Sequence, residues 1–157
     1  MSRILTRAEA VRFVETERSQ GRVIVFTNGV FDILHPGHVR YLADARAQGD
    51  VLIIGLNSDA SVRRLDKGPD RPLNPEQERA EVLAALRSVD AVVVFDEDTP
   101  LEIVTALQPD VLVKGADWAA DAIVGRDVVE ARGGRVMRIP VAAGYSTSAL
   151  IARARGN

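Results

Sequence analysis

The stretch TNGVFDILHPGH, residues Thr27 to His38, decides the fold, because a β-rich run leads through it into a helix start. Gly29 marks a turn, and Pro36 suits the first turn of a helix, where no backbone N–H is needed. Gly37 lets a bulky anion approach a helix N-terminus, whose free N–H groups and partial positive charge favour phosphate. The stretch therefore predicts a strand, a turn and a phosphate-binding helix start.

The only two histidines of the chain, His35 and His38, lie inside this stretch. Imidazoles at a helix start can donate hydrogen bonds to phosphate oxygens as charge builds there. Two other interpretations stay open: the histidines cap the helix and fill space, or they chelate a metal ion as an H-x-x-H pair. Without cysteine or a third histidine, only carboxylates such as Asp32 could complete a metal site.

Short apolar runs alternate with helical stretches on both sides of this segment. Five strands are predicted, at Val23–Thr27, Val51–Leu56, Ala91–Phe95, Val111–Val113 and Arg135–Ile139. The first four lack polar alternation, as strands covered on both faces do, whereas the last alternates like an edge strand. The pattern predicts an α/β fold: a Rossmann-like, five-stranded parallel sheet with helices on both faces and right-handed crossovers.

Capping and breaker signals set the helix boundaries. Thr6 and Glu9 form a T-x-x-E capping box. Asn74 precedes Pro75 as an N-cap, and Thr99 is predicted to cap the next helix. The chain has the length of one domain, residues 1–157, with an N-terminal helix at about 6–20 and a catalytic core at about 22–157. The predicted helices span about 6–20, 36–48, 75–86, 100–108, 123–132 and 146–154.

Parallel sheets of this kind bind ligands beyond the carboxyl ends of their strands, where the strand order reverses. Besides Thr27–His38, the segments expected there are Asn57–Leu73, Lys114–Trp118 and Gly144–Ser148. The strand that ends before Lys114 is expected beside the first strand, so that Lys114 faces the HPGH segment across a crevice. Otherwise this lysine is an ordinary surface cation, and Trp118 is either core packing or a ligand wall.

The remaining segments carry cations and hydroxyls. Ser61–Leu73 is a basic loop that could close over a triphosphate or simply be solvated. Ser146–Ser148 offers three hydroxyls at a helix start, where phosphate oxygens bind well, although a plain N-cap needs only one. Lys67 and Lys114 are the only lysines among 20 basic residues, so they are either placed for a purpose or a result of codon bias. The cations of the loop are Arg63, Arg64, Lys67 and Arg71.

Composition excludes several classes of protein. With 46% hydrophobic and 27% charged residues, the chain has the composition of a globular domain rather than a disordered one. A net charge of −2 argues against nucleic acid or an anionic membrane as partner. The absence of cysteine excludes disulfides, thiolate zinc sites and cysteine nucleophiles. Apolar runs are too short for a membrane span, and the N-terminus lacks a signal peptide's apolar core, so a soluble, cytoplasmic protein is expected. P-loop, dinucleotide-binding and G-x-S-x-G motifs are absent.

The motif G-x-F-D-x-x-H-x-G-H at Gly29–His38, with Ser146-Thr147-Ser148 before the last helix, resembles the cytidylyltransferase-like nucleotidyltransferase superfamily with its HxGH fold. From about Gly21 onward, the chain is similar to the adenylyltransferase domain of bacterial ADP-heptose synthase, often fused to a sugar kinase. Its 157 residues leave no room for a kinase, so the stand-alone form is expected. The resemblance implies transfer of AMP from ATP to D-glycero-D-manno-heptose 1-phosphate, giving ADP-heptose and pyrophosphate for the lipopolysaccharide core. The similar stretches are TNGVFDILHPGHVRYLADAR, LNSDASVRRLDKGPDRPLN, FDEDTP, PDVLVKGADW and YSTSALI.

The motifs and this resemblance together assign the site. The catalytic residues are expected to be His35, His38, Lys67 and Lys114. The nucleotide-binding residues are expected to be Thr27, Asn28, Gly29, Val30, Phe31, His35, Gly37, His38, Arg71, Gly115, Asp117, Ser146, Thr147 and Ser148. The acceptor-binding residues are expected to be Asp32, Asn57, Asp59, Lys67 and Lys114. ATP is the expected substrate, with Mg²⁺ held mainly by its phosphates and not by protein ligands. The other expected partner is a sugar 1-phosphate, and since superfamily relatives often dimerise, a homodimer is considered.

Two alternatives remain at this point. Glycerol-3-phosphate cytidylyltransferases carry R-T-E-G-I-S-T before the last helix, where this chain has VAAGYST, residues 141–147. Val141 and Ala143 replace the arginine and the glutamate, which favours a purine against an apolar wall over cytosine. A catalytically silent nucleotide-binding regulator is the other alternative, and the intact His35 and His38 argue against it.

Overall fold

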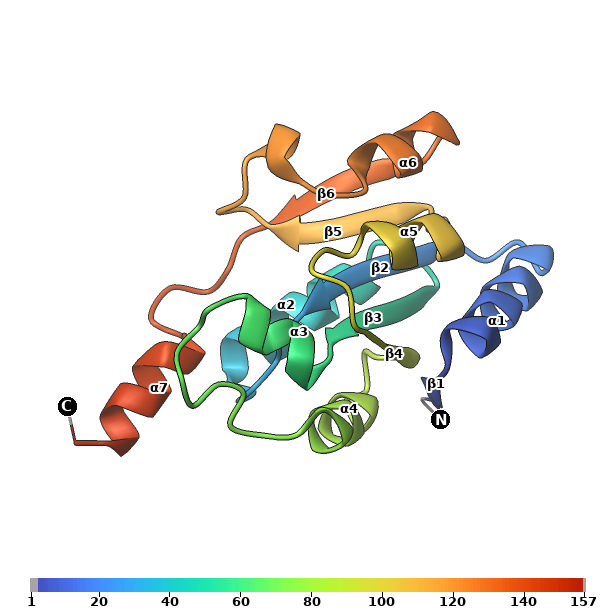
Figure 1. Cartoon of the computed structure of the whole chain (residues 1–157). Coiled ribbons are helices and arrows are strands. Elements are labelled where there is room, and N and C mark those ends of the chain that lie inside the picture. Colours follow the sequence, from blue (N-terminus) through green and yellow to red (C-terminus); the bar gives the residue numbers. More distant parts are fainter. Residues whose placement is uncertain (1–2, 157) are drawn as a thin grey trace.

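A six-stranded, all-parallel sheet organises the computed structural model, which describes residues 3–156 (Figure 1). The strand order is β1-β4-β3-β2-β5-β6. The strands are β1 (Arg3–Leu5), β2 (Ile24–Gly29), β3 (Val51–Asn57), β4 (Ala91–Phe95), β5 (Val111–Gly115) and β6 (Arg135–Ile139). The helices are α1 (Arg7–Ser19), α2 (Pro36–Arg46), α3 (Asp59–Arg64), α4 (Glu76–Ala84), α5 (Leu101–Leu107), the 3₁₀ turn η1 (Ala120–Ala122), α6 (Arg126–Ala131) and α7 (Thr147–Ala154).

The α/β parallel architecture is confirmed, but the prediction of five strands was wrong by one. The additional strand β1 pairs with β4 through Arg3↔Ala91 and Leu5↔Val93. Its three residues are too few to show the alternation of apolar and polar side chains that marks a strand in sequence. Only its pairing with β4, 88 positions later, defines it as a strand. The alternating segment Arg135–Ile139 is an edge strand, as predicted.

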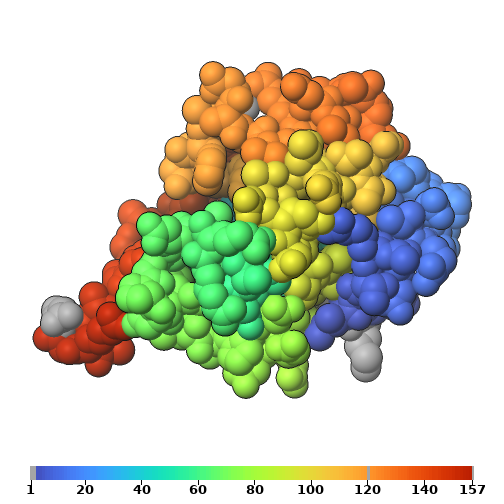
Figure 2. Space-filling view, viewed as in Figure 1, coloured from blue at the N-terminus to red at the C-terminus, as the bar shows by residue number. Residues whose placement is uncertain are grey.

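Two apolar clusters fill the two faces of the sheet, because successive side chains of a strand point to opposite sides. Ile24 and Phe26 of β2 belong to the cluster under α1, α5 and α6. Val25, between them, belongs to the cluster under α2 and α4, with Leu42 and Leu83. Helices therefore cover both faces, as predicted. Figure 2 shows α7 projecting on the side opposite α1, and no residue of α7 is buried.

Local capping signals were partly right. Thr6 and Glu9 form the capping box, and Pro36 opens α2. Asn74 is not an N-cap: α4 begins after Pro75 without a side-chain cap, and Asn74 Nδ2 donates instead to the Asp32 carbonyl at 2.6 Å. Thr99 is not the N-cap of α5 either, since Pro100 takes that position.

The predicted basic loop is helical in its first part. Ser58 Oγ accepts the Ser61 N–H and caps α3, whose Ser61 and Val62 are buried, so the loop proper follows Arg64. Strand β5 runs on to Gly115, which places Lys114 within the strand rather than after it. No helix among residues 3–156 is long and apolar enough to cross a membrane.

Candidate active site

A cavity of about 810 Å³ opens at the carboxyl ends of β2 and β5, which are neighbours in the sheet. From β2 the chain proceeds outward through β3 to β4, and then returns to β5 on the other side of β2. This is the reversal of strand order at which such sheets bind ligands. All four segments predicted from the sequence contribute residues to the cavity wall, as does the loop after β4.

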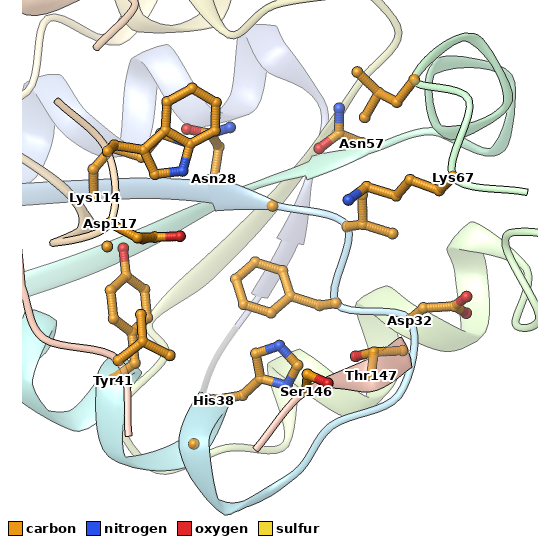
Figure 3. A pocket seen from close by; sticks show the side chains of 18 of the residues that line it. Asn28, Asp32, His38, Tyr41, Asn57, Lys67, Lys114, Asp117, Ser146 and Thr147 are labelled. Atoms are coloured by element: carbon orange, nitrogen blue, oxygen red, sulfur yellow. The ribbon is translucent and has the colours of Figure 1, made fainter. Parts of the chain in front are cut away.

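The two histidines lie together at the start of α2 (Figure 3 shows His38). His35 Nδ1 accepts the backbone N–H of His38 at 3.3 Å, and the rings stack with centroids 3.8 Å apart. Burial lowers the pKa of His35; burial and the neighbouring His35 lower the pKa of His38 to about 4. Both imidazoles are therefore neutral at physiological pH, and each offers one N–H donor.

Gly37 is needed here for a reason that the sequence did not reveal. A Cβ at this position would lie 2.9 Å from the His35 ring and 3.0 Å from Cβ of Tyr145. The Tyr145 ring also stacks beside His35, with centroids 5.9 Å apart. The glycine thus lets the start of α2 approach the segment before α7, in addition to leaving room for an anion.

Both lysines of the chain line the same cavity. Burial lowers the pKa of Lys114, with Asp117 opposing this shift and Lys67 adding to it. Neither ammonium group forms an ion pair with any residue in 3–156. Lys114 Nζ lies 4.9 Å from the centre of the Trp118 ring. Because Trp118 is 48% exposed, it is a wall of the cavity and not core packing.

Asp32 and Arg71 have contacts other than the predicted ones. The carboxylate of Asp32 is fully buried and accepts Arg71 Nε at 2.7 Å and the N–H groups of Leu73 and Asn74 at 2.9 and 3.0 Å. Burial acts to raise the pKa of Asp32, yet these donors together lower it. The pair fastens the loop that carries Lys67 to the segment between β2 and α2, and both Asp32 and Arg71 also line the cavity.

Thr27 and Asp59 do not line the cavity. Thr27 is fully buried, donates to the Val113 carbonyl at 2.9 Å and hydrogen-bonds the Tyr41 hydroxyl, so it ties β2 to β5 and α2. Asp59 accepts from Arg79 Nη2 at 2.8 Å. The structure therefore gives both residues contacts with the protein where ligand contacts were predicted.

The start of α7 faces the cavity with all three predicted hydroxyls. Ser146 Oγ accepts the Ala149 N–H, so it is the N-cap, and Thr147 Oγ1 donates to the Ile33 carbonyl at 3.1 Å. These bonds use two hydroxyls for structure and hold the helix start against the HPGH segment. The other predicted residues that line the cavity are Asn28, Gly29, Val30, Phe31, Asn57, Gly115, Asp117 and Ser148.

Several residues of the site were missed. Arg79 is fully buried and donates to the carbonyls of Val30, Asn57 and Asn74, which ties the ends of β2 and β3 to the loop. Nothing distinguishes it in sequence from the chain's other arginines. Arg79 does not itself line the cavity, whereas Tyr41 does, and burial raises the pKa of Tyr41 to about 12. The loop residues Asp98, Thr99 and Pro100 follow a strand end, and the carboxyl-end rule applied to β4 would have found them.

The side chains present do not form a metal site by themselves. Within the described part of the chain, no three His, Asp or Glu side chains are grouped so as to hold a metal ion.

Comparisons with known proteins show the family of the chain. The family model described as "Cytidylyltransferase-like" matches residues 26–153. The bifunctional protein HldE of Syntrophotalea carbinolica is 57% identical over 152 residues, covering 97% of this chain and 31% of that protein. The HldE protein of Hyphomonas neptunium is 60% identical over 140 residues, covering 89% and 29%. The chain thus spans about a third of the length of the curated relatives it matches.

Two solved structures share the fold. A lipopolysaccharide core biosynthesis protein from Thermoplasma volcanium GSS1 superposes with a TM-score of 0.64 at 28% identity, over 78% of this chain and 98% of that one. A pantoate-beta-alanine ligase from Francisella tularensis, complexed with beta-gamma ATP and beta-alanine, also has a TM-score of 0.64, over 94% of this chain and 69% of that one. At 14% identity, the second comparison concerns the fold alone.

Proposed function

The chain belongs to the cytidylyltransferase-like family of nucleotidyltransferases, and from this premise we propose that it transfers AMP from ATP to D-glycero-D-manno-heptose 1-phosphate. The products are ADP-heptose and pyrophosphate, and the reaction serves lipopolysaccharide core synthesis. The similarity to the HldE proteins over nearly the whole chain, and to a structure named for lipopolysaccharide core biosynthesis, supports this acceptor.

One observation carries the proposal. The cavity gathers both histidines, both lysines and the start of α7, although these groups come from positions 35 to 148 of the chain. A helix N-terminus, neutral imidazole donors and two unpaired ammonium groups are what a nucleoside triphosphate and a second phosphate require in one place.

The chemistry is an in-line displacement at the α-phosphorus of ATP. An oxygen of the sugar phosphate attacks, a new O–P bond forms, and the bond from the α-phosphorus to the bridging oxygen breaks. The electron pair of that bond leaves with pyrophosphate. Because the attacking oxygen is already anionic, no general base is needed, and catalysis depends on positioning and charge stabilisation. Neutral histidines suit this mechanism, since they act as donors rather than bases.

Each group has a proposed role. His38 and His35 donate to the α- and β-phosphates as negative charge builds in the transition state. Lys67 approaches the triphosphate and the sugar phosphate from its loop, and Lys114 neutralises the incoming sugar phosphate. Mg²⁺ bound to the triphosphate would supply further charge neutralisation. The base and ribose lie near Gly115 and Asp117, in front of the start of α7.

Nucleotide choice follows from the wall beside this position. Val141 lines the cavity and, like Ala143, has no side-chain hydrogen bond to offer a base edge. A site built for cytosine would supply such groups, and leaving polar groups unpaired is costly. We therefore expect ATP to exceed CTP by at least about tenfold in kcat/KM, a gap of ~1.4 kcal/mol.

The test is a panel of nucleoside triphosphates crossed with sugar 1-phosphates and glycerol 3-phosphate, with detection of pyrophosphate. We expect the highest kcat/KM for ATP with the heptose 1-phosphate. If CTP with any acceptor matched or exceeded ATP, the adenylyl assignment would be wrong. No pyrophosphate with any pair would instead support the silent regulator.

A further inference from the structure

The cavity has two chemically different ends (Figure 3). His38, Ser146 and Thr147 lie at one end, and Asn28 and Asn57 lie at the other, with Lys67 and Lys114 on opposite sides. The Trp118 ring is beside Lys114, whose Nζ lies 4.9 Å from the ring centre. The first end has the helix starts and the neutral imidazoles that suit a triphosphate. The second end has two amides and, beside Lys114, an indole in place of imidazoles, so it suits a different ligand group.

An unpaired polar atom at the second end indicates a missing ligand. Asn28 Oδ1 is buried and has no hydrogen-bond partner in the part of the chain that the structure describes. A buried acceptor without a donor is costly, and folded proteins seldom keep one without a functional reason. Asn28 is at the end of β2 and lines the cavity, so a ligand hydroxyl could supply the donor.

A second amide lies on the neighbouring strand. Asn57, at the end of β3, is only 4% exposed and also lines the cavity. Its Nδ2 donates to Ser61 Oγ at 3.0 Å, which fixes the orientation of the amide. Asp98 and Thr99 follow β4, whose last residue pairs with Asn57, and they add a carboxylate and a hydroxyl to the cavity wall. Asp98 accepts Arg64 Nε through Oδ1, and its side chain is 71% exposed. Amides, carboxylates and hydroxyls are the side chains that hydrogen-bond sugar hydroxyls.

An apolar wall completes this end. The exposed indole of Trp118 is joined by Ala122 and Val124 from the segment after β5 and by Pro100 from the segment after β4. The segment after β5 and the helix α5, which follows Pro100, are in contact beyond the cavity. Gly125 packs so closely against Val104 of α5 that an added Cβ would lie 2.9 Å from the valine side chain. An apolar face opposite hydrogen-bonding groups matches a sugar, which presents C–H bonds on one side and hydroxyls around its edge.

We infer that this end of the cavity, formed by Trp118, Asn28, Asn57 and the Asp98–Pro100 loop, binds the polyhydroxylated part of the sugar phosphate acceptor. The acceptor's phosphate lies between Lys67 and Lys114, whose ammonium groups lack ion-pair partners among residues 3–156. The inference rests on the proposed function, and it assigns the hydroxyls to residues other than Asp32, whose two carboxylate oxygens both accept protein donors, and Asp59, which does not line the cavity.

The first experiment separates binding from folding. Asn28→Ala removes an acceptor that has no protein partner, so the variant should melt within about 2 °C of wild type. It should raise KM for the sugar phosphate about tenfold or more, with KM for ATP within about twofold. The matched control is Gln48→Ala, an amide removed between α2 and β3, at the amino ends of the strands and outside the cavity lining, which should leave both KM values unchanged.

The second experiment uses Trp118 as a direct probe of binding, because it is the only tryptophan of the chain. A sugar 1-phosphate without ATP should change its emission saturably, and inorganic phosphate at equal concentration should change it less. If ATP changed the Trp118 emission fully and the sugar phosphate did not change it, the adenine base would lie at this end, and the inference would be overturned. An unchanged sugar KM in Asn28→Ala, in an enzyme that does turn over, would overturn it as well. If wild type releases no pyrophosphate with any sugar 1-phosphate, the proposed function itself fails.

Discussion

The buried pair Asp32–Arg71 offers the sharpest test of how the site is held together. The side chain of Asp32 is 0% exposed and that of Arg71 is 9% exposed, and the carboxylate also accepts two backbone N–H groups. Asp32→Asn keeps the size of the side chain but replaces an accepting oxygen with a donating NH₂ group. That group would face N–H donors, and Arg71 would lose its partner.

The expected cost follows from these contacts. Breaking a buried ion pair by removing one charge costs about 3–5 kcal/mol. For a domain of this size, ~3 kcal/mol corresponds to a fall in Tm of roughly 6–12 °C. Because the pair also fixes the loop that carries Lys67, kcat should fall in the folded variant. Thermal and urea denaturation measure the first effect, and pyrophosphate release measures the second.

A matched control is Glu130→Gln, which makes the same chemical change in the exposed pair Arg126–Glu130. Exposed pairs of this kind contribute about 0.5 kcal/mol or less. Acid gives a further check, because the folded pKa of Asp32 lies below its ordinary 3.8. The stabilisation is then complete above 3.8 and is lost as pH falls through the folded pKa, so wild type and Asp32→Asn should converge there. If Asp32→Asn melted like Glu130→Gln at neutral pH, the reasoning would be refuted.

Three further predictions concern the cationic and imidazole groups. His38→Ala should lower kcat by ~10²–10³, about 3–4 kcal/mol, with little change in ATP binding; a wild-type rate in steady-state assays would remove His38 from the site. Lys67→Arg and Lys114→Arg keep the charge but replace a compact ammonium with a broad planar group, so each should impair turnover, and unchanged kinetics in both would contradict their phosphate roles. The pKa of His38 falls from 6.5 to about 4 on folding, so protonation favours the unfolded state and stability is lost as pH falls through that window. The Tm of wild type and of His38→Gln should therefore be measured at about pH 7 and at about pH 5. The Tm should fall less between these pH values in His38→Gln than in wild type, and an equal fall in both would contradict a buried, neutral imidazole at this position.

The sequence by itself determined those features that depend on neighbouring residues. Apolar runs bounded by glycine and proline located the five longer strands, since the strand period and the breakers act over a few residues. The capping box at Thr6 and the helix start at Pro36 were confirmed for the same reason. Strand–helix alternation further placed Lys114 across from the HPGH segment, because parallel crossovers allow few topologies.

Tertiary structure alone decided the contacts between residues far apart in the chain. Asp32 is paired with an arginine 39 positions later, and Arg79 reaches the ends of two strands. Any of the chain's many arginines could have matched these acceptors, so composition and spacing could not choose among them. The three-residue β1 was missed because it is defined only by its partner strand.

The position of Trp118 shows the same limit. Its residue type permits either a core or a ligand wall, and the sequence carries no signal that separates the two. The fold decided in favour of the wall, because the turn after β5 leaves the indole half exposed beside Lys114 and lining the cavity. Local sequence thus set which segments meet at the carboxyl ends of the strands, whereas burial and pairing in three dimensions set which of their side chains remain free to bind a ligand.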